Sequence, residues 1–70
     1  NAASKFAKTP RYNLAKMYLI YGLAEPALPI LKGLLGSSPG DLDLQNAVAN
    51  AYFLMSDYNQ AFAYFQQIPG

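Results

Sequence analysis

An internal repeat with a period of about 34 residues is the feature that most constrains how this chain can fold. When the sequence is shifted against itself by one period, the matched positions share small side chains or large apolar ones. These pairs are Leu14 with Val48, Ala15 with Ala49, Tyr18 with Tyr52, Ala27 with Ala61, Leu31 with Phe65 and Leu34 with Ile68. Gly22 matches Ser56, and both fall where a turn is expected. The period indicates that one supersecondary unit occurs twice.

The first copy predicts two helices. Thr9 can cap a helix that has Pro10 at its first position, and the segment 11–21 holds no breaker before Gly22. A second helix is expected to open at 24–26 and to run to Gly36. Pro29 lies near the end of its first turn, where the ring should distort the helix start without breaking the whole element.

The second copy predicts two more helices after a loop at 36–41. Asp41 or Asp43 is expected to cap a third helix that runs to Met55, and Asp57 a fourth from residue 58 to about residue 68. The final Pro-Gly at 69–70 should stop it. Alternation with a period of two is absent, so strands are not expected. The sequence therefore predicts an all-α fold of two tandem helix-turn-helix hairpins.

This pattern resembles the tetratricopeptide repeat, which reads W-x2-L-G-x2-Y, then A-x3-F, then P over about 34 residues. Both copies depart from it at the first aromatic, where Arg11 and Gln45 stand. The resemblance implies a first repeat at 9–41, a second, C-terminally truncated repeat at 42–70, and an N-terminal tail or tag remnant at 1–8. The small residues should let helices cross closely while larger ones fill the space around them. The expected packing residues are Leu14, Ala15, Tyr18, Ala27, Leu31, Pro39, Val48, Ala49, Tyr52, Ala61 and Phe65.

The resemblance also implies a concave groove, formed by the first helix of each hairpin, that holds an extended peptide or a helix of another protein. Thr9 and Asp43 would lie at its rim. With a single lysine, this groove does not resemble the basic clamps for acidic chaperone tails, so a partner with apolar side chains is expected. As an alternative, the four apolar groove residues pack against a neighbouring repeat or an N-terminal helix. The expected groove residues are Tyr12, Lys16, Leu19, Ile20, Asn46, Asn50, Phe53 and Leu54.

Composition argues against several other functions. The chain has no Cys and no His, which removes disulfides, thiolate chemistry and Cys/His metal sites. No nucleophile–base constellation or phosphate loop is apparent, so we expect neither an enzyme nor a cofactor. A net charge of +1 does not favour nucleic acid as partner. No apolar stretch is long enough for a transmembrane helix, so a soluble chain without direct membrane insertion is expected.

The two predicted repeats leave apolar surface at the ends of the stack. Stacked repeats usually need about three units with polar caps, whereas this chain supplies two, and its fourth predicted helix is rich in aromatic residues. Either the chain is a segment of a longer array, or two copies form a homodimer through the aromatic ends. The expected function is an adaptor or scaffold segment that binds another protein. The alternatives are a small chaperone of apolar secretion substrates and a homo-oligomerisation module.

Overall fold

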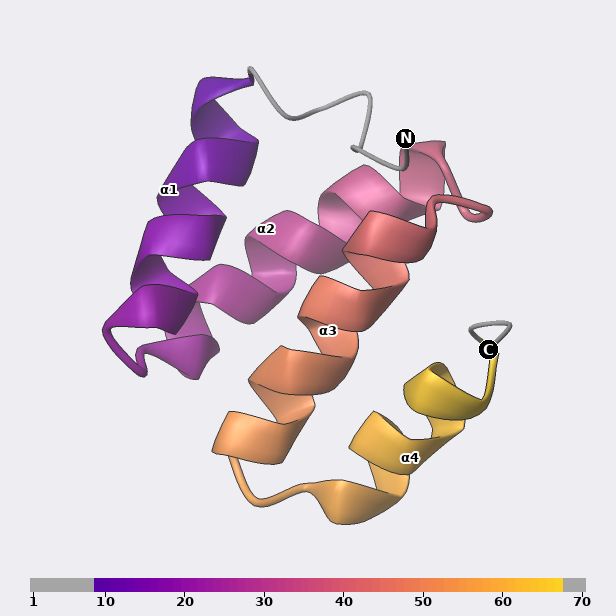
Figure 1. The fold of residues 1–70 in the computed structure, drawn as a ribbon. Coiled ribbons are helices and arrows are strands. Elements are labelled where there is room, and N and C mark those ends of the chain that lie inside the picture. The colour runs from indigo at the N-terminus through magenta and orange to yellow at the C-terminus, as the bar shows by residue number, and fades with distance from the viewer. Residues whose placement is uncertain (1–8, 68–70) are drawn as a thin grey trace.

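A computed structural model describes residues 9–67 of the chain. These residues form four helices, α1 (Pro10–Ile20), α2 (Ala24–Ser37), α3 (Leu42–Leu54) and α4 (Tyr58–Gln66), and no strand (Figure 1). The predicted all-α fold of two helical hairpins is confirmed. Helix α2 packs on both α1 and α3, and α4 packs on α3 alone among the described helices. None of the four helices is both long and apolar enough to cross a membrane.

The first hairpin turns through a left-handed glycine. Gly22 has φ +76°, and its N–H donates to the Leu19 carbonyl at 3.0 Å. The next N–H, that of Leu23, donates to the Tyr18 carbonyl at 2.7 Å. This pair of bonds is the Schellman motif, which satisfies carbonyls that the helix end leaves without a donor. It explains why α1 ends where the sequence places Gly22.

The second hairpin makes the same turn at the matching repeat position, with a serine in place of the glycine. Ser56 has φ +63°, and its N–H donates to the Phe53 carbonyl at 3.0 Å. The N–H of Asp57 donates to the Tyr52 carbonyl at 2.9 Å. The repeat in the sequence is thus also a repeat in backbone conformation.

The helix starts follow the predictions in part. The Asp41 carboxylate accepts from the Leu44 N–H at 3.2 Å, and the Asp57 carboxylate accepts from the Gln60 N–H at 3.4 Å. Thr9 occupies the N-cap position of α1, but its side chain makes no capping bond, so that prediction is wrong. Helix α2 runs without interruption through Pro29. Helix α4 ends at Gln66, earlier than predicted, and the expected stop at 69–70 lies outside the described residues.

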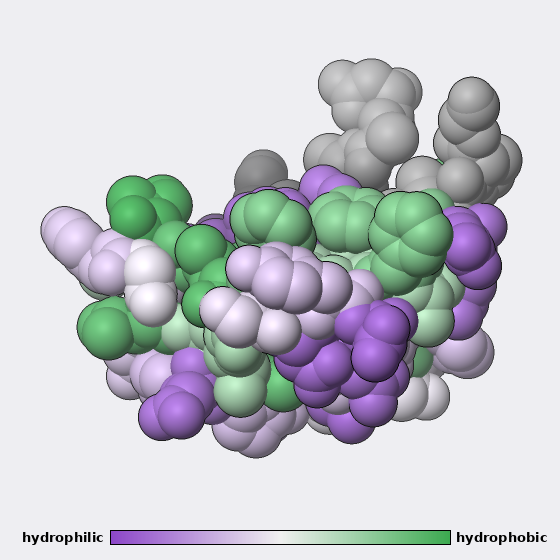
Figure 2. Space-filling view, turned by 90° about the horizontal axis from the view of Figure 1, so that it is seen from below, coloured by the Kyte–Doolittle hydropathy of each residue, from purple (hydrophilic) through white to green (hydrophobic). Residues whose placement is uncertain are grey.

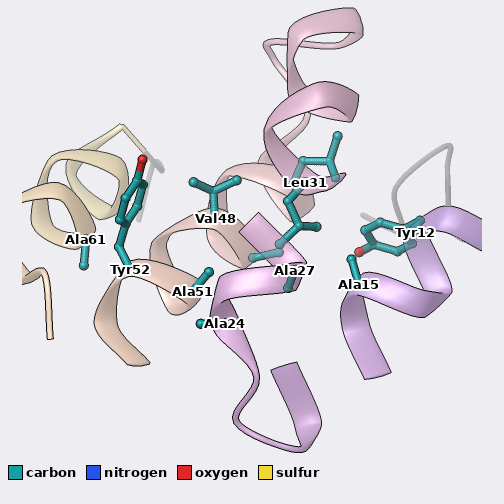
Figure 3. Close-up of a cluster of buried hydrophobic side chains, with 11 residues drawn as sticks. Tyr12, Ala15, Ala24, Ala27, Leu31, Val48, Ala51, Tyr52 and Ala61 are labelled. Atoms are coloured by element: carbon teal, nitrogen blue, oxygen red, sulfur yellow. The ribbon is translucent and has the colours of Figure 1, made fainter. Parts of the chain in front are cut away.

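Small side chains dominate the core, and they let the helices approach one another closely. In the close-up of Figure 3, Val48 and Ala51 of α3 lie on the side that faces α2, while Tyr52 lies toward Ala61 of α4. Leu31 of α2 is fully buried between the two hairpins. The buried core cluster consists of Tyr12, Ala15, Ala24, Ala27, Leu31, Leu44, Ala47, Val48, Ala51, Tyr52 and Ala61.

Most of the expected packing residues are inside the protein, and three are not. Leu14 is 42% exposed because no described helix covers the outer side of α1, and Phe65 is 36% exposed because α4 has a neighbour on one side only. Pro39 is exposed in the loop between α2 and α3. For these three residues the predicted packing is wrong. The structure buries Ala15, Ala27, Leu31, Val48, Ala49, Tyr52 and Ala61 and half-buries Tyr18.

Gln45 stands where the resembled repeat has an aromatic residue, and it is 8% exposed. Its Nε2 donates to the Pro39 carbonyl at 2.7 Å, which ties α3 to the loop before it. Its Oε1 is buried without a hydrogen-bond partner among the described residues. The glutamine therefore replaces aromatic packing with a polar anchor at the start of the second hairpin.

Candidate interaction groove

An open groove of about 310 Å³ lies between α1 and α3. Each helix contributes three side chains, and each side chain from α1 has its counterpart at the matching repeat position on α3. Two equivalent helix faces, one from each hairpin, thus stand next to each other. The lining residues are Lys16, Leu19, Ile20, Asn50, Phe53 and Leu54. All six belong to the eight groove residues that the sequence predicts.

The apolar residues of this groove remain open to water. Ile20 is 80% exposed, and Phe53 and Leu54 are each about half exposed, while Leu19 is half-buried. They stay uncovered because α1 and α3 touch each other only sparsely and α2 packs against both from another side. Figure 2 views the molecule from the end at which both hairpin turns lie, and it shows hydrophobic side chains at the surface on the α1 side, at left.

The aromatic wall of the groove is held in place by α4. The Phe53 ring lies 5.3 Å from the Tyr58 ring, centroid to centroid, at an interplanar angle of 59°. Tilted aromatic pairs of this kind are mutually attractive. The Tyr58 ring therefore supports the Phe53 ring at the wall of the groove.

Tyr12 does not line the groove, which corrects the prediction made for it. It is 4% exposed, and its hydroxyl donates to the carboxylate of Asp43. Burial raises the pKa of Tyr12 well above its ordinary value, and the hydrogen bond to Asp43 and the charges of Asp43 and Asp41 act in the same direction. Asp43 is therefore a structural acceptor for Tyr12 as well as a residue near the predicted rim.

Lys16 is placed by the same tyrosine. Its Nζ lies 5.5 Å from the centre of the Tyr12 ring, within the range of a cation–π contact. The ammonium group is held against the Tyr12 ring, beside the groove. The groove consequently has one positive group, one amide at Asn50 and an apolar remainder.

Two other predicted groove positions lie apart from this lining. Asn46 is exposed on α3, about one turn before Asn50, and is not among the lining residues. Thr9 is half-buried at the N-cap of α1. The repeat alignment correctly predicts three pairs of lining residues, which are Lys16 with Asn50, Leu19 with Phe53 and Ile20 with Leu54. It fails for the pair Tyr12 and Asn46, because Tyr12 is buried and Asn46 does not line the groove.

A second hollow of about 310 Å³ was not predicted from the sequence. It lies at the turn of the first hairpin, next to the groove, and Leu54 lines both. Its other walls come from 22–26 and Met55, with the acidic residue Glu25 among them. The sequence predicts only a turn here, and the apolar Leu23 directly after Gly22, which is exposed, is the signal that could have indicated this surface.

Two polar contacts between the hairpins were also missed. Tyr12 of the first hairpin bonds to Asp43 of the second, and Lys32 Nζ donates to the Tyr52 hydroxyl at 3.2 Å. The hydrogen bond to Tyr52 raises the pKa of Lys32. Tyr52 in turn stacks on Tyr64 of α4 with a centroid distance of 5.7 Å. No local pattern marks such contacts, because they depend on how one hairpin lies on the other.

The groove combines exposed apolar side chains with one ammonium group and one amide. Among residues 9–67 no cluster of three or more His, Cys, Asp or Glu side chains could hold a metal ion. Comparison with family models, curated proteins and solved structures found no match to the chain. Its function is therefore inferred from its residues and their geometry.

Proposed function

We propose that the protein is a protein-interaction module that binds an extended peptide or a helix with apolar side chains in the α1–α3 groove. The observation that carries this proposal is the meeting of six exposed or half-buried residues from equivalent faces of two helices in one open groove. Contiguous apolar surface that water covers is typical of interaction sites. We assign no catalytic step to it.

We further propose that the chain belongs to the tetratricopeptide-repeat family and acts as an adaptor or scaffold segment. The repeat period, the buried alanines at the helix crossings and the two equivalent hairpin turns support this assignment. In that family the first helices of successive hairpins form the binding face, and α1 and α3 line the groove here.

Each part of the groove has a distinct role in the proposal. Ile20, Phe53 and Leu54 contact apolar side chains of the partner, and burying them stabilises the complex by about 25 cal/mol per Å² of apolar area before association costs are subtracted. The Asn50 side chain has both donors and an acceptor, so it can pair with a peptide backbone. The Lys16 ammonium favours an acidic group or a C-terminal carboxylate at its end of the groove.

Selection from a displayed library of random peptides tests the proposal. We expect the enriched peptides to carry apolar residues at regular spacing. Phe53→Ala should weaken their binding at least tenfold and Asn50→Ala about threefold, measured by fluorescence anisotropy, since buried aromatic anchors dominate such interfaces. Ile20→Ala gives a second test that leaves the Phe53–Tyr58 ring contact intact.

Matched controls come from α4, which carries the same residue types at exposed positions outside the groove. Phe62→Ala and Asn59→Ala should leave peptide affinity within about twofold of the unaltered protein, since neither residue lines the groove. The proposal fails if no apolar peptides are enriched, or if the groove variants bind as tightly as these controls.

A further inference from the structure

Two helix faces of the molecule are apolar and have no covering element among the described residues. One runs along the outer side of α1, and the other runs along α4, each at the spacing of a single helix face. The residues on α1 are Leu14, Met17 and Tyr21, and those on α4 are Tyr58, Phe62 and Phe65. All six side chains are exposed.

The positions that correspond to these two faces in the other repeat are packed against each other inside the molecule. A residue of the α1 face corresponds to the residue one repeat period later, on α3, and a residue of the α4 face corresponds to the residue one period earlier, on α2. The counterparts are Val48, Ala51 and Met55 on α3, and Ala24, Leu28 and Leu31 on α2. At the junction between α2 and α3, the buried residues are Val48, Ala51, Ala24 and Leu31 (Figure 3). Leu28 is half-buried and Met55 is exposed. The two exposed faces are therefore the equivalents of the two sides of a junction that the molecule already makes once.

We propose that copies of this chain associate head to tail, with the Tyr58/Phe62/Phe65 face of α4 in one copy packed on the Leu14/Met17/Tyr21 face of α1 in the next, in the arrangement of α2 on α3. The occupant of each face is a second copy because one chain supplies both complementary sides. No groove-lining residue belongs to either face, although Tyr58 of the α4 face contacts Phe53 of the groove.

Charge supports the head-to-tail direction over contact between two α1 faces. Residues 1–32 carry all five basic residues and one acid, whereas residues 33–70 carry three acids and no base. Helix α1 carries Arg11 and Lys16 and no acid, whereas α4 carries no charged residue and has Asp57 at its N-cap. Contact between two α1 faces therefore brings like charges together, and contact between α1 and α4 does not. Complementary potentials fix the direction of association.

The side chains also set the strength of the contact. The internal junction uses Ala24 and Ala51, whereas the outer faces have Tyr58 and Met17 at the same positions. Larger residues hold the two helices farther apart, so the contact between copies is less tight than the one within a copy. A contact whose two sides differ also leaves a free face at each end, so assemblies can grow beyond a dimer.

Sedimentation equilibrium of the 70-residue chain over micromolar to millimolar concentrations tests this proposal. We expect the average mass to rise with concentration and to pass that of a dimer. Met17→Glu places a charge on the α1 face and Phe62→Glu on the α4 face, and each variant alone should associate at least tenfold more weakly. An equimolar mixture should form a one-to-one dimer that grows no further, because each variant retains one functional face.

Ala63→Glu is the matched control, since this exposed residue of α4 lies off the proposed face. It should associate as the unaltered chain does, and far-UV circular dichroism should show unchanged helicity in every variant used. Tyr21→Glu and Phe65→Glu replace the first pair if either of those fails to fold. A chain that stays monomeric throughout overturns the proposal. So does self-association of Met17→Glu alone, of Phe62→Glu alone, or a mixture that does not dimerise.

Discussion

The two hairpins place equivalent residues in opposite environments. Leu14 in the first hairpin is 42% exposed, while its counterpart Val48 in the second is fully buried. Leu31 is fully buried, while its counterpart Phe65 is 36% exposed. Among the described helices, α2 and α3 each have a neighbour on two sides, whereas α4 has one neighbour. Position in the stack, rather than residue type, decides which copy of a repeated side chain reaches the core.

The same contrast appears at the start of each hairpin. Tyr12 is buried and donates to Asp43 because the beginning of α3 covers it, whereas its counterpart Asn46 is exposed. Among the described residues there is no third hairpin to cover Asn46 in the same way. The polar contact at Tyr12 therefore belongs to the interface between hairpins and not to the hairpin as a unit.

The largest difference in stability between the two hairpins is expected on truncation of Leu31 and Phe65, which occupy the same position of the repeat. Leu31→Ala should lower the free energy of unfolding by about 2–5 kcal/mol, as for other fully buried leucines. A chain of this size has about 3–5 kcal/mol in total, so this variant should be largely unfolded. Phe65→Ala should cost about 1 kcal/mol, because the ring already contacts water. Urea unfolding followed by circular dichroism measures both, and equal losses would show that exposure does not decide the cost.

Removing the Tyr12 hydroxyl should have the next largest effect. Tyr12→Phe should cost about 1–2 kcal/mol, since it removes a hydrogen bond to a charged acceptor. Asn46→Ala, at the equivalent exposed position, should cost less than about 0.5 kcal/mol. The same unfolding measurements compare the two variants. Equal costs would mean that the Tyr12–Asp43 contact does not stabilise the junction.

The same tyrosine makes a prediction about pH. Its pKa is raised in the folded state, so the folded protein favours the neutral phenol. The associated stability is intact below the ordinary tyrosine pKa of 10.0 and is lost as pH rises beyond it, because the unfolded chain then releases this proton first. Tyr12→Phe should flatten the fall in stability above pH 10. Tyr58→Phe, at an exposed tyrosine, is the matched control and should leave the slope as it is in the unaltered chain.

The smallest effects should come from the two turns, which differ in one residue. Ser56 adopts φ +63°, a left-handed conformation that costs a non-glycine residue about 1 kcal/mol, so Ser56→Gly should stabilise the protein by up to that amount. Gly22→Ala should destabilise it by about 1 kcal/mol through its φ of +76°, since no atom lies within 4 Å of an added Cβ. Thermal unfolding should show shifts of opposite sign. Shifts of the same sign would refute the equivalence of the two turns.

The sequence predicts those parts of the fold that depend on neighbouring residues. The period, Gly22, and the aspartates at 41 and 57 determine the helices and turns through local hydrogen bonds, and the structure places them close to where they were expected. Six groove residues are predicted correctly because the same face is used on the first helix of each repeat. Tyr12 was placed wrongly because its environment depends on how α1 lies against α3. The predictions for Leu14 and Phe65 are wrong because alignment of the repeats does not show which helix faces are left without a neighbour among residues 9–67.

The arrangement in which α2 packs on α1 and α3, and α4 on α3 alone, also bears on how the chain folds. The main contacts join helices that follow one another along the chain, so each requires closure of only a short loop, and little chain entropy is lost before contacts form. Low contact order of this kind is associated with fast folding. The free energy of local opening should therefore differ between helices. Helix α4 packs on one described helix, so its opening should cost the least free energy. Because Tyr58 on α4 supports Phe53, local opening of α4 would also loosen the aromatic wall of the groove.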